Sequence, residues 1–403
     1  MNSLNLSSNL LYQKFAERTL CYAVYGGADF GECIMTMQNI GDGDVDCWYN
    51  EWLTTASRIE NIGDQCLDNG HVISAREAFL RASNYYRTAY IPLFGKPIDQ
   101  RLISSFNTET KVFQKACSLF TPSIEIIEIP FDNITLPAYF VKVDNSSNPR
   151  PTVIHTNGYD SNIQEMYFAH ANAAIRRGYN CLLFDGPGQG RNLIQDKIPL
   201  RHDWENIVSH VIEYASSRVE INSKKITLVG WSFGGFLASR AAAFEHRIAA
   251  LIADPGQWDL KDSIFNIFYL TEEDKNNFPN IDLTKLQVIE NKLRNEDSNS
   301  MLKWSIIQRG FWVNDAKSLF DYIKKMLLYE ISPVVHKIKC PTLITYSEND
   351  PLASNALKLY KNLMAPKKLI PFTAAEGSGG HCQMMARSLY HQRVFDWLDE
   401  ILM

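Results

Sequence analysis

The residues from 225 to 235 have the types and spacing of a serine nucleophile. A short apolar, β-branched run ends in Gly230-Trp-Ser-Phe-Gly234, and the small residues that follow favour a helix. A strand, a sharp turn and a helix form the context in which Gly-x-Ser-x-Gly lifts a serine hydroxyl above a sheet. Glycine is required at both ends, because a Cβ atom there would collide with a neighbouring strand or helix. Ser232 is the predicted nucleophile.

A base for Ser232 is predicted near the C-terminus. Serine is a weak nucleophile until a base removes its proton, and an acid must hold that base in the correct tautomer. Around this pattern the three residues follow in the order serine, acid, histidine. Four histidines follow Ser232: His246, His336, His381 and His391. His381 lies in a glycine-rich loop before the terminal helix, so we predict His381 as the base and expect His246 and His391 to be structural.

The predicted acid follows a buried strand. Residues 342–346 form an apolar run, and Asp350 comes just after it in a turn that Pro351 closes. A carboxylate at this place can orient His381. Asp254 ends the preceding predicted strand and is the alternative acid, although it could instead cap the turn that starts there.

Two backbone N–H groups are predicted to stabilise the negative oxygen that forms when Ser232 attacks a carbonyl. The amide of Phe233 lies at the start of the helix, and the amide of Tyr159 lies in the loop at residues 155–160, after the third predicted strand. Gly158 allows this loop to approach the nucleophile closely. A chance match to the serine pattern is the alternative, but it would not supply an acid, a base and this loop in the expected order.

Three further side chains are candidates for contact with substrate: Trp231, Asp160 and Asp254. They lie beside the nucleophile, in the loop after the third strand, and at the end of the sixth strand. The hydroxyl of Tyr159 could also reach substrate. For Tyr159 and Asp160, holding the loop in place is the competing interpretation.

No pattern in the sequence indicates a cofactor or a metal, and we expect neither. Residues 185–190 read Asp-Gly-Pro-Gly-Gln-Gly, which differs from the spacing of dinucleotide sites, and Pro187 lacks the N–H that a phosphate would need. We interpret this segment as the turn after the fourth strand. The eight cysteines form no Cys-x-x-Cys pair, which argues against a zinc site or a disulfide scaffold and suits a reducing cytoplasm.

Composition and charge restrict the class of partner. The chain has 403 residues, 45% of them hydrophobic, and can bury a large core. A formal net charge of −5 provides no basic field for nucleic acid or for an anionic membrane. We find no signal-peptide pattern, and no run approaches the roughly 20 apolar residues of a membrane span. The expected partner is therefore a small-molecule carbonyl substrate, and the expected location is cytoplasmic.

The elements that position these residues are predicted to form two domains. Residues 1–120 read as a helical cap domain, since they contain no convincing period-2 run. Ser74-Ala-Arg-Glu77 is predicted as a capping box, and aromatic residues follow it at helical spacing until Pro92. These aromatic residues could line a substrate cavity, although such a stripe usually forms ordinary core.

Residues 121–403 form the second predicted domain, in which strands and helices alternate. This alternation is typical of an α/β fold with a mostly parallel sheet and helices on both faces. About residues 257–335 separate the sixth and seventh strands, far more than an ordinary connection needs, and their helical, aromatic content predicts an inserted lid. The predicted strands are residues 124–129, 136–143, 152–156, 180–185, 225–230, 248–254, 342–346 and 369–372.

Together, these motifs resemble those of the α/β-hydrolase family. The segments that carry the resemblance are residues 155–160, 185–190, 230–235, the turn at Asp350, and residues 377–381. N-terminal segments are similar to one branch of the family, at residues 27–31, 48–52 and 74–88. That branch contains 2,6-dihydroxypseudooxynicotine hydrolase, the fungal pigment hydrolases that shorten polyketides, and esterases related to the fermentation-respiration switch protein.

The resemblance implies an α/β-hydrolase fold, a helical N-terminal domain over the active site, a Ser-His-Asp triad, and a homodimer. Several members of the branch hydrolyse a carbon–carbon bond next to a carbonyl group. Some are thought to use an extra carboxylate after the sixth strand. Asp259 and Asp262 lie in that region of this chain, but neither matches a defined motif.

We therefore predict a serine hydrolase that cleaves a carbon–carbon bond of a β-diketone, an aryl ketone or a polyketide-like molecule. Hydrolysis of an ester or thioester, and acyl transfer or cyclisation, are alternatives within the enzyme class. The alternative of another class is a non-catalytic protein that keeps the hydrolase fold and binds a partner. The complete triad argues against it, because an unused site would tolerate the loss of any member.

Overall fold

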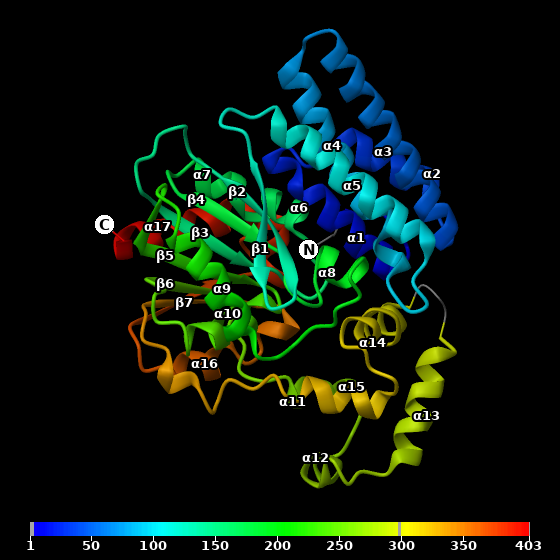
Figure 1. The fold of residues 1–403 in the computed structure, drawn as a ribbon. Helices are drawn as coiled ribbons and strands as arrows, with labels where there is room; N and C mark the ends of the chain where they lie inside the picture. Colours follow the sequence, from blue (N-terminus) through cyan, green and yellow to red (C-terminus); the bar gives the residue numbers. More distant parts are fainter. Residues whose placement is uncertain (1–3, 297–299, 403) are drawn as a thin grey trace.

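One mixed β-sheet forms the centre of the molecule (Figure 1). The computed structural model describes residues 4–296 and 300–402. Within these residues the sheet has eight strands in the order β1-β2-β4-β3-β5-β6-β7-β8. The pairs β1–β2 and β2–β4 are antiparallel, and all other neighbours run parallel. The strands are β1 (Glu125–Phe131), β2 (Ile134–Val141), β3 (Arg150–Thr156), β4 (Asn180–Phe184), β5 (Ile221–Trp231), β6 (Ala250–Asp254), β7 (Thr342–Ser347) and β8 (Lys367–Phe372).

The parallel strands bring the loops that carry the predicted site to one edge of the sheet. Strands β4 and β6 are buried along their whole length, as expected for strands that helices cover on both faces. Thr156 at the end of β3 pairs with Gly230, and Trp231 at the end of β5 pairs with Asp254. Because the carboxyl ends of parallel strands meet at one edge, the loops after β3, β5, β6 and β7 converge there.

Helices cover both faces of this sheet (Figure 1). On one face α10 packs against β5, β6 and α9. On the other, His391 Nε2 of α17 lies 2.8 Å from the Ala169 carbonyl oxygen of the helical segment η3. The predicted α/β fold class is thus confirmed. No helix in the described residues has the length and apolar character to cross a membrane. The segments are α6 (Ile163–Met166), η3 (Tyr167–Ala171), α7 (Asn172–Ile175), α8 (Gly190–Ile194), α9 (Trp204–Ser216), α10 (Gly234–Ala242), α16 (Ala356–Asn362) and α17 (Arg387–Leu402).

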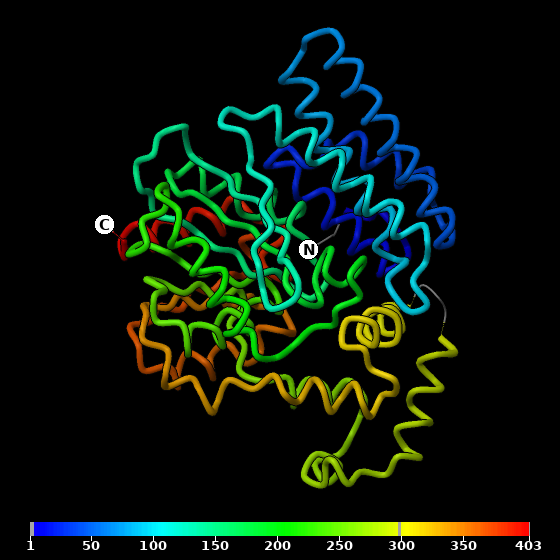
Figure 2. The backbone as a smooth tube through the Cα atoms, in the orientation of Figure 1, coloured from blue at the N-terminus to red at the C-terminus, as the bar shows by residue number. Residues whose placement is uncertain are grey.

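A helical region precedes the sheet and packs along one side of it (Figures 1 and 2). The predicted aromatic stripe belongs to α4, where Phe79, Tyr85 and Tyr90 are buried. The Tyr85 hydroxyl donates to Glu32, and the Tyr90 hydroxyl donates to Glu109, each at 2.6 Å. The stripe therefore forms the core of this region. Its helices are α1 (Leu10–Cys21), α2 (Phe30–Ile40), α3 (Val45–Asp68), α4 (Val72–Tyr90) and α5 (Gln100–Ser118).

The start of α4 differs from the prediction. The helix begins at Val72 with His71 as its N-cap, and no side chain caps it. Gly70, at a φ of +77°, lets the chain reverse direction within a short turn after α3. Because α4 starts directly after that turn, Ser74 already lies inside its first turn. The predicted capping box of Ser74 and Glu77 is therefore wrong, although the predicted helix is present.

The segment between β6 and β7, which we call the lid, reaches the N-terminal helices (Figure 2). The Trp304 indole N–H donates to the Ile91 carbonyl at 3.2 Å. The Trp304 ring also stacks on Phe94, with the ring centroids 6.2 Å apart. The lid is thus tied to the helical region as well as to the sheet. Its segments are α11 (Lys261–Ile267), α12 (Glu272–Asn277), α13 (Leu283–Arg294), η4 (Lys303–Gly310), α14 (Phe311–Val313) and α15 (Leu319–Met326).

Candidate active site

Ser232 occupies a strained turn between β5 and α10. Its φ of +58° lies in the left-handed region, which costs a non-glycine residue on the order of 1–3 kcal/mol. Two hydrogen bonds hold the turn. The Ser232 N–H donates to the Asp254 carbonyl at 2.6 Å, and the Gln257 side chain donates to the Ser232 carbonyl, also at 2.6 Å. These bonds fix the serine at the carboxyl edge of the sheet.

Two glycines make this turn possible. A Cβ atom at Gly230 would lie 2.0 Å from the Gly234 carbonyl oxygen, and a Cβ atom at Gly234 would lie 2.4 Å from the Thr156 carbonyl oxygen. Both contacts are with backbone atoms, which cannot move aside without displacing α10 or β3. The predicted need for glycine at both positions is confirmed.

The structure brings Ser232, His381 and Asp350 together in one chain of hydrogen bonds. Ser232 Oγ lies 2.8 Å from His381 Nε2, and His381 Nδ1 lies 2.8 Å from Asp350 Oδ2. Asp350 also accepts a hydrogen bond from the Leu352 N–H at 3.0 Å. The Asp350 side chain is fully buried, whereas 37% of the His381 side chain is exposed. The ring can therefore meet a substrate while its carboxylate partner is sealed from water.

The electrostatics of this pair suit a proton acceptor. Burial alone would lower the pKa of His381, but the Asp350 carboxylate outweighs burial and raises that pKa above 6.5. Burial alone would raise the pKa of Asp350, but the adjoining imidazole lowers it below its ordinary value. With a proton on Nδ1 donated to Asp350, His381 Nε2 is free to accept the proton of Ser232.

Asp254, the alternative acid, makes no hydrogen bond to His381. Its side chain is completely buried, and Oδ1 accepts a hydrogen bond from the Thr345 hydroxyl at 2.6 Å. Its other oxygen, Oδ2, lies 3.9 Å from Arg387 Nη1. Burial raises the pKa of Asp254. The Asp254 backbone carbonyl accepts the hydrogen bond of the Ser232 N–H, so Asp254 supports the turn. A contact between Asp254 and substrate stays a prediction.

The two predicted oxyanion donors flank Ser232. Among the residues that the structure describes, no backbone carbonyl accepts a hydrogen bond from the N–H of Phe233 or of Tyr159. A Cβ atom at Gly158 would lie only 3.0 Å from the Cβ atom of Ser232, so the loop after β3 passes directly beside the nucleophile. Both N–H groups are therefore available to donate a hydrogen bond to a substrate oxygen. Their catalytic role stays a prediction.

The side chains of these two residues belong to a group of packed aromatic rings. The rings of Tyr159 and Phe233 meet edge to face, with centroids 5.4 Å apart. Tyr329, which follows α15, packs against Phe233 at 4.9 Å. The Arg309 guanidinium of η4 lies 5.1 Å from the centroid of the Tyr159 ring. The lid thus contributes directly to the surroundings of the nucleophile.

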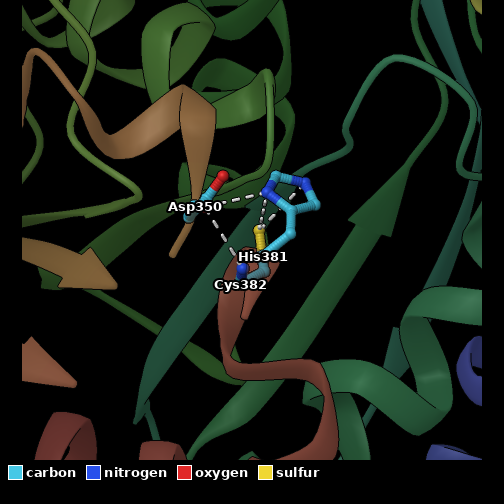
Figure 3. A group of neighbouring side chains, drawn as sticks. All are labelled: Asp350, His381 and Cys382. Carbon is cyan, nitrogen blue, oxygen red and sulfur yellow. Dashed lines mark hydrogen bonds and ion pairs between the residues drawn. The ribbon is translucent and has the colours of Figure 1, made fainter. Parts of the chain in front are cut away.

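Cys382 lies beside the histidine, an arrangement that sequence reasoning missed (Figure 3). Its Sγ atom is 3.5 Å from His381 Nε2, and its side chain is fully buried. Among the described residues, Asp350, His381 and Cys382 could hold a metal ion, since their donor atoms lie within 4.8 Å of one another. Burial raises the pKa of the Cys382 thiol well above its ordinary value, and a protonated thiol is a poor ligand. The group fits a triad better than a metal site.

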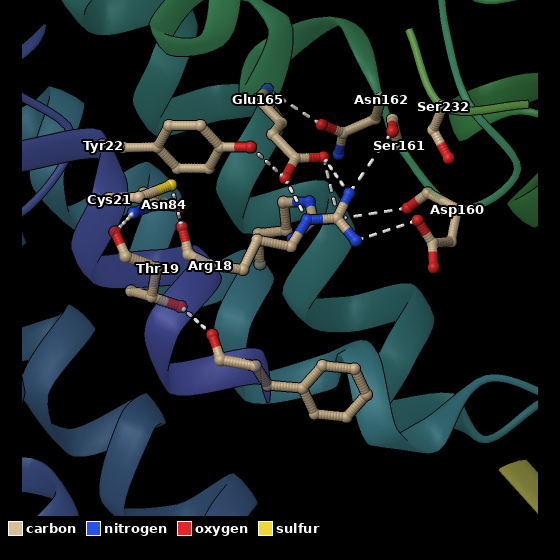
Figure 4. A network of polar contacts seen from close by, with 12 residues as sticks. Arg18, Thr19, Cys21, Tyr22, Asn84, Asp160, Ser161, Asn162, Glu165 and Ser232 are labelled. Atoms are coloured by element: carbon tan, nitrogen blue, oxygen red, sulfur yellow. Dashed lines mark hydrogen bonds and ion pairs between the residues drawn. The ribbon is translucent and has the colours of Figure 1, made fainter. Parts of the chain in front are cut away.

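Trp231 and Asp160, the other predicted substrate contacts, are held by protein groups. Trp231 is 1% exposed, and the Arg18 guanidinium lies 5.6 Å from its ring centroid. The Asp160 carboxylate binds Arg18 at 2.9 Å and Arg309 at 2.6 Å. Figure 4 shows Asp160 facing Arg18, close to Ser232. These contacts favour the interpretation that Asp160 holds its loop, and substrate contact by either residue stays a prediction.

Three other motifs from the sequence are not part of the triad. Asp259 pairs with Lys358 at 3.4 Å, and Asp262 pairs with Lys275, so neither carboxylate is joined to the triad. Residues 185–190 form the turn between β4 and the start of α8. This agrees with the prediction of a turn at that position.

Several residues around the site had little or no signal in the sequence. Gln257, just after β6, could have been proposed as a site residue because of its position at the end of that strand. Arg18 and Arg309 are 142 and 149 residues away from Asp160, so no local pattern connects them. Cys382 adjoins the predicted base, but its packing against the imidazole depends on the left-handed backbone at that residue, with a φ of +50°.

Two protein-family models match the chain. The model described as the alpha/beta hydrolase family matches residues 153–395, from β3 into α17. The model described as esterase FrsA-like matches residues 39–257, from the N-terminal helices to the end of β6 and three residues beyond. Each match covers more than half of the chain, and together they include the helical region and the sheet.

Individual relatives extend over nearly the whole chain. Hydrolase acrC of Aspergillus aculeatus is 31% identical and covers 95% of this chain and 94% of its own. The 20-hydroxy-prefusarin hydrolase FUS2 of Gibberella moniliformis is 30% identical, with the same coverage of both chains. The crystal structure of 2,6-dihydroxy-pseudo-oxynicotine hydrolase is 22% identical, with a TM-score of 0.75 over 95% of each chain. That similarity shows a shared fold, including the N-terminal helices.

Replacing Gly230 with alanine should destabilise the protein. The new methyl group would overlap the Gly234 carbonyl, and forced overlap costs typically about 1–3 kcal/mol. Chemical denaturation should show the lower free energy of unfolding. Gly31→Ala is the matched control, because its Cβ would meet only the Asp29 side chain at 3.5 Å, and the free energy of unfolding should stay equal or rise. Equal stability of Gly230→Ala and the parent protein would contradict the turn geometry.

The rate at which a fluorophosphonate labels Ser232 should rise with pH through the pKa of His381. Because Asp350 raises that pKa, the midpoint should lie above pH 6.5. Asp350→Asn removes the charge, so the midpoint should move to lower pH. The maximal rate should also fall by about 10⁴-fold, because the amide no longer selects the required tautomer. Labelling rates between about pH 5 and 9 test this, and a midpoint that rises in the variant would contradict the assigned pair.

Proposed function

We propose that this chain, which belongs to the esterase FrsA-like branch of the α/β-hydrolase family, is a serine hydrolase with the triad Ser232, His381 and Asp350. Family membership confirms the resemblance found in the sequence and makes the chain a hydrolase. One observation carries the proposed triad: an unbroken chain of hydrogen bonds links Ser232 Oγ to the Asp350 carboxylate, with 2.8 Å at each step. Burying a carboxylate beside an imidazole costs desolvation energy, which a purely partner-binding role would not require.

In this mechanism His381 Nε2 accepts the Ser232 proton as Oγ attacks a carbonyl carbon, and Asp350 stabilises the imidazolium. The N–H groups of Phe233 and Tyr159 hold the negative oxygen of the tetrahedral intermediate. Each such donor contributes about 10²–10³-fold to the rate. The intermediate collapses, and the leaving group takes the proton from the imidazolium. Water, activated by the same imidazole, then releases the acyl group.

We further propose that the cleaved bond joins the acyl carbon to another carbon. A carbanion can leave only when a second carbonyl or an aromatic ring delocalises its charge, so the substrate would be a β-diketone, an aryl ketone or a polyketide-like molecule. The rings of Tyr159, Phe233 and Tyr329 beside the nucleophile support a planar, apolar substrate. The relative named as a 20-hydroxy-prefusarin hydrolase supports a small-molecule substrate.

Hydrolysis of a carboxylic ester or thioester is the second candidate. The match to a family described as FrsA-like esterases favours it. The same triad serves both reactions, because they differ only after the tetrahedral intermediate has formed. An alkoxide or thiolate leaves without a delocalising group, so the substrate, rather than the triad, distinguishes the two candidates.

Ser232→Ala should lose activity toward any substrate that the parent protein hydrolyses. The substitution removes the attacking oxygen, so kcat/KM should fall by at least about 10³-fold. A panel of p-nitrophenyl esters and aryl 1,3-diketones, with product masses determined, is the measurement. A carboxylic acid plus a methyl ketone from the diketone would establish carbon–carbon cleavage, whereas turnover of the esters alone would favour the second candidate.

Ser239→Ala is the matched control for this experiment. Ser239 lies on α10, is fully buried, and donates to the Gly235 carbonyl at 2.7 Å, so it has no path to a substrate. Its replacement should leave kcat/KM within about twofold of the parent value. Equal turnover by Ser232→Ala and the parent protein would defeat the proposed function.

A further inference from the structure

The loop that carries the Tyr159 amide is clamped at the next residue, Asp160, by three arginines from three separate parts of the chain. Arg18 of α1 donates to Oδ1 at 2.9 Å, and Arg309 of η4 in the lid donates to Oδ2 at 2.6 Å. Arg87 of α4 donates to the Asp160 backbone carbonyl at 3.0 Å. Both carboxylate oxygens and the carbonyl are thus fixed.

This clamp lies in a poorly hydrated part of the molecule. The exposed side-chain fraction is 13% for Asp160, 12% for Arg18 and 21% for Arg309. Burial alone would raise the pKa of Asp160, but Arg18, Arg309 and Arg87 together lower it well below its ordinary value. Asp160 therefore stays ionised. Charge-assisted hydrogen bonds in such surroundings hold geometry more firmly than bonds at an exposed surface.

The clamped residue is next to the proposed oxyanion donor. The Tyr159 amide and the Asp160 side chain are separated by a single Cα-to-Cα step, and Gly158 brings the same loop against Ser232. The Tyr159 ring contacts the Phe233 ring, with centroids 5.4 Å apart, and its centroid lies 5.1 Å from the Arg309 guanidinium. A displacement of Asp160 would therefore change the direction of the Tyr159 N–H relative to the nucleophile.

We propose that Asp160 is a positioning residue, which aims the Tyr159 N–H at the oxyanion by locking its loop to Arg18 of α1 and to Arg309 of the lid. This inference rests on the proposed function, since it requires the Ser232 reaction. It adds that the oxyanion site is complete only when the N-terminal helices and the lid are both in place. Arg18 and Arg309 thus act on the chemistry through Asp160.

The chain offers a matched control at Glu32 of α2. Its side chain is 16% exposed, close to the 13% of Asp160, and it binds Arg81 of α4 at 3.0 Å. Glu32 also accepts a hydrogen bond from the Tyr85 hydroxyl at 2.6 Å. It shares no arginine with Asp160, so a variant at Glu32 removes a comparable arginine-paired charge and leaves the residues that hold the Tyr159 loop in place.

The experiment measures covalent labelling of Ser232 by a fluorophosphonate in the full-length protein, and separates kinact from KI. For Asp160→Asn, kinact should fall by about tenfold or more, because a misdirected donor no longer stabilises the developing charge. KI should stay within about twofold. Arg309→Gln, which keeps Arg18 on Asp160, should lower kinact by about three- to tenfold. Glu32→Gln should change kinact by less than about twofold.

A fall in kinact for Asp160→Asn and Arg309→Gln but not for Glu32→Gln would support the positioning role. An equal fall in all three variants, or none in either of the first two, would overturn it. If Asp160→Asn does not fold, Arg309→Gln decides in the same way. Ser232→Ala separates this inference from the proposed function: if the parent protein is not labelled, or is labelled no faster than Ser232→Ala, the proposed function itself fails.

Discussion

The left-handed turn at Ser232 is the constraint on which the rest of the site depends. Such a turn is unfavourable for serine, and it persists because the Asp254 carbonyl accepts the Ser232 amide and because Gly230 lets the backbone of α10 approach β5. Strand β5 must therefore run beside β6, and α10 must start against the end of β3. Parallel pairing then places the loops after β3 and β7 at the same edge, where they meet the serine. The strained serine and the backbone contacts that compensate for it thus require β3, β5 and β6 to lie next to one another.

Regions outside the sheet complete this edge. The lid and the N-terminal helices meet each other through Trp304 and Ile91, and both reach the loop of Tyr159 through arginines that bind Asp160. A buried ion pair contributes little net stability, because desolvation offsets much of the attraction. Its directional bonds are better suited to fixing one arrangement of several segments. In this molecule they fix the arrangement at the loop beside the nucleophile.

The fold and the central site residues could be predicted because their signals are local. Eight apolar runs marked the strands, and the turn motifs after three of them placed Ser232, Asp350 and Tyr159 at the correct edge. The start of α4 was predicted wrongly, since Ser74 fits a capping motif but Gly70 sets the turn before it. The clamp on Asp160 could not be predicted. A buried arginine has the same sequence signal as an exposed one, and its partners are brought together only by the packing of distant segments.

Two buried aspartates at neighbouring strand ends show how position selects chemical behaviour. Asp254 and Asp350 are both removed from water, which favours the protonated form of each. Asp350 faces an imidazole, and the imidazole lowers its pKa, whereas Asp254 faces a threonine hydroxyl and a guanidinium 3.9 Å away, and its pKa stays raised. An acid must remain ionised to stabilise an imidazolium, and a pKa pushed below the ordinary value meets that requirement. The same edge therefore holds one carboxylate suited to orienting a base and another whose main contribution is the backbone carbonyl that holds the nucleophile.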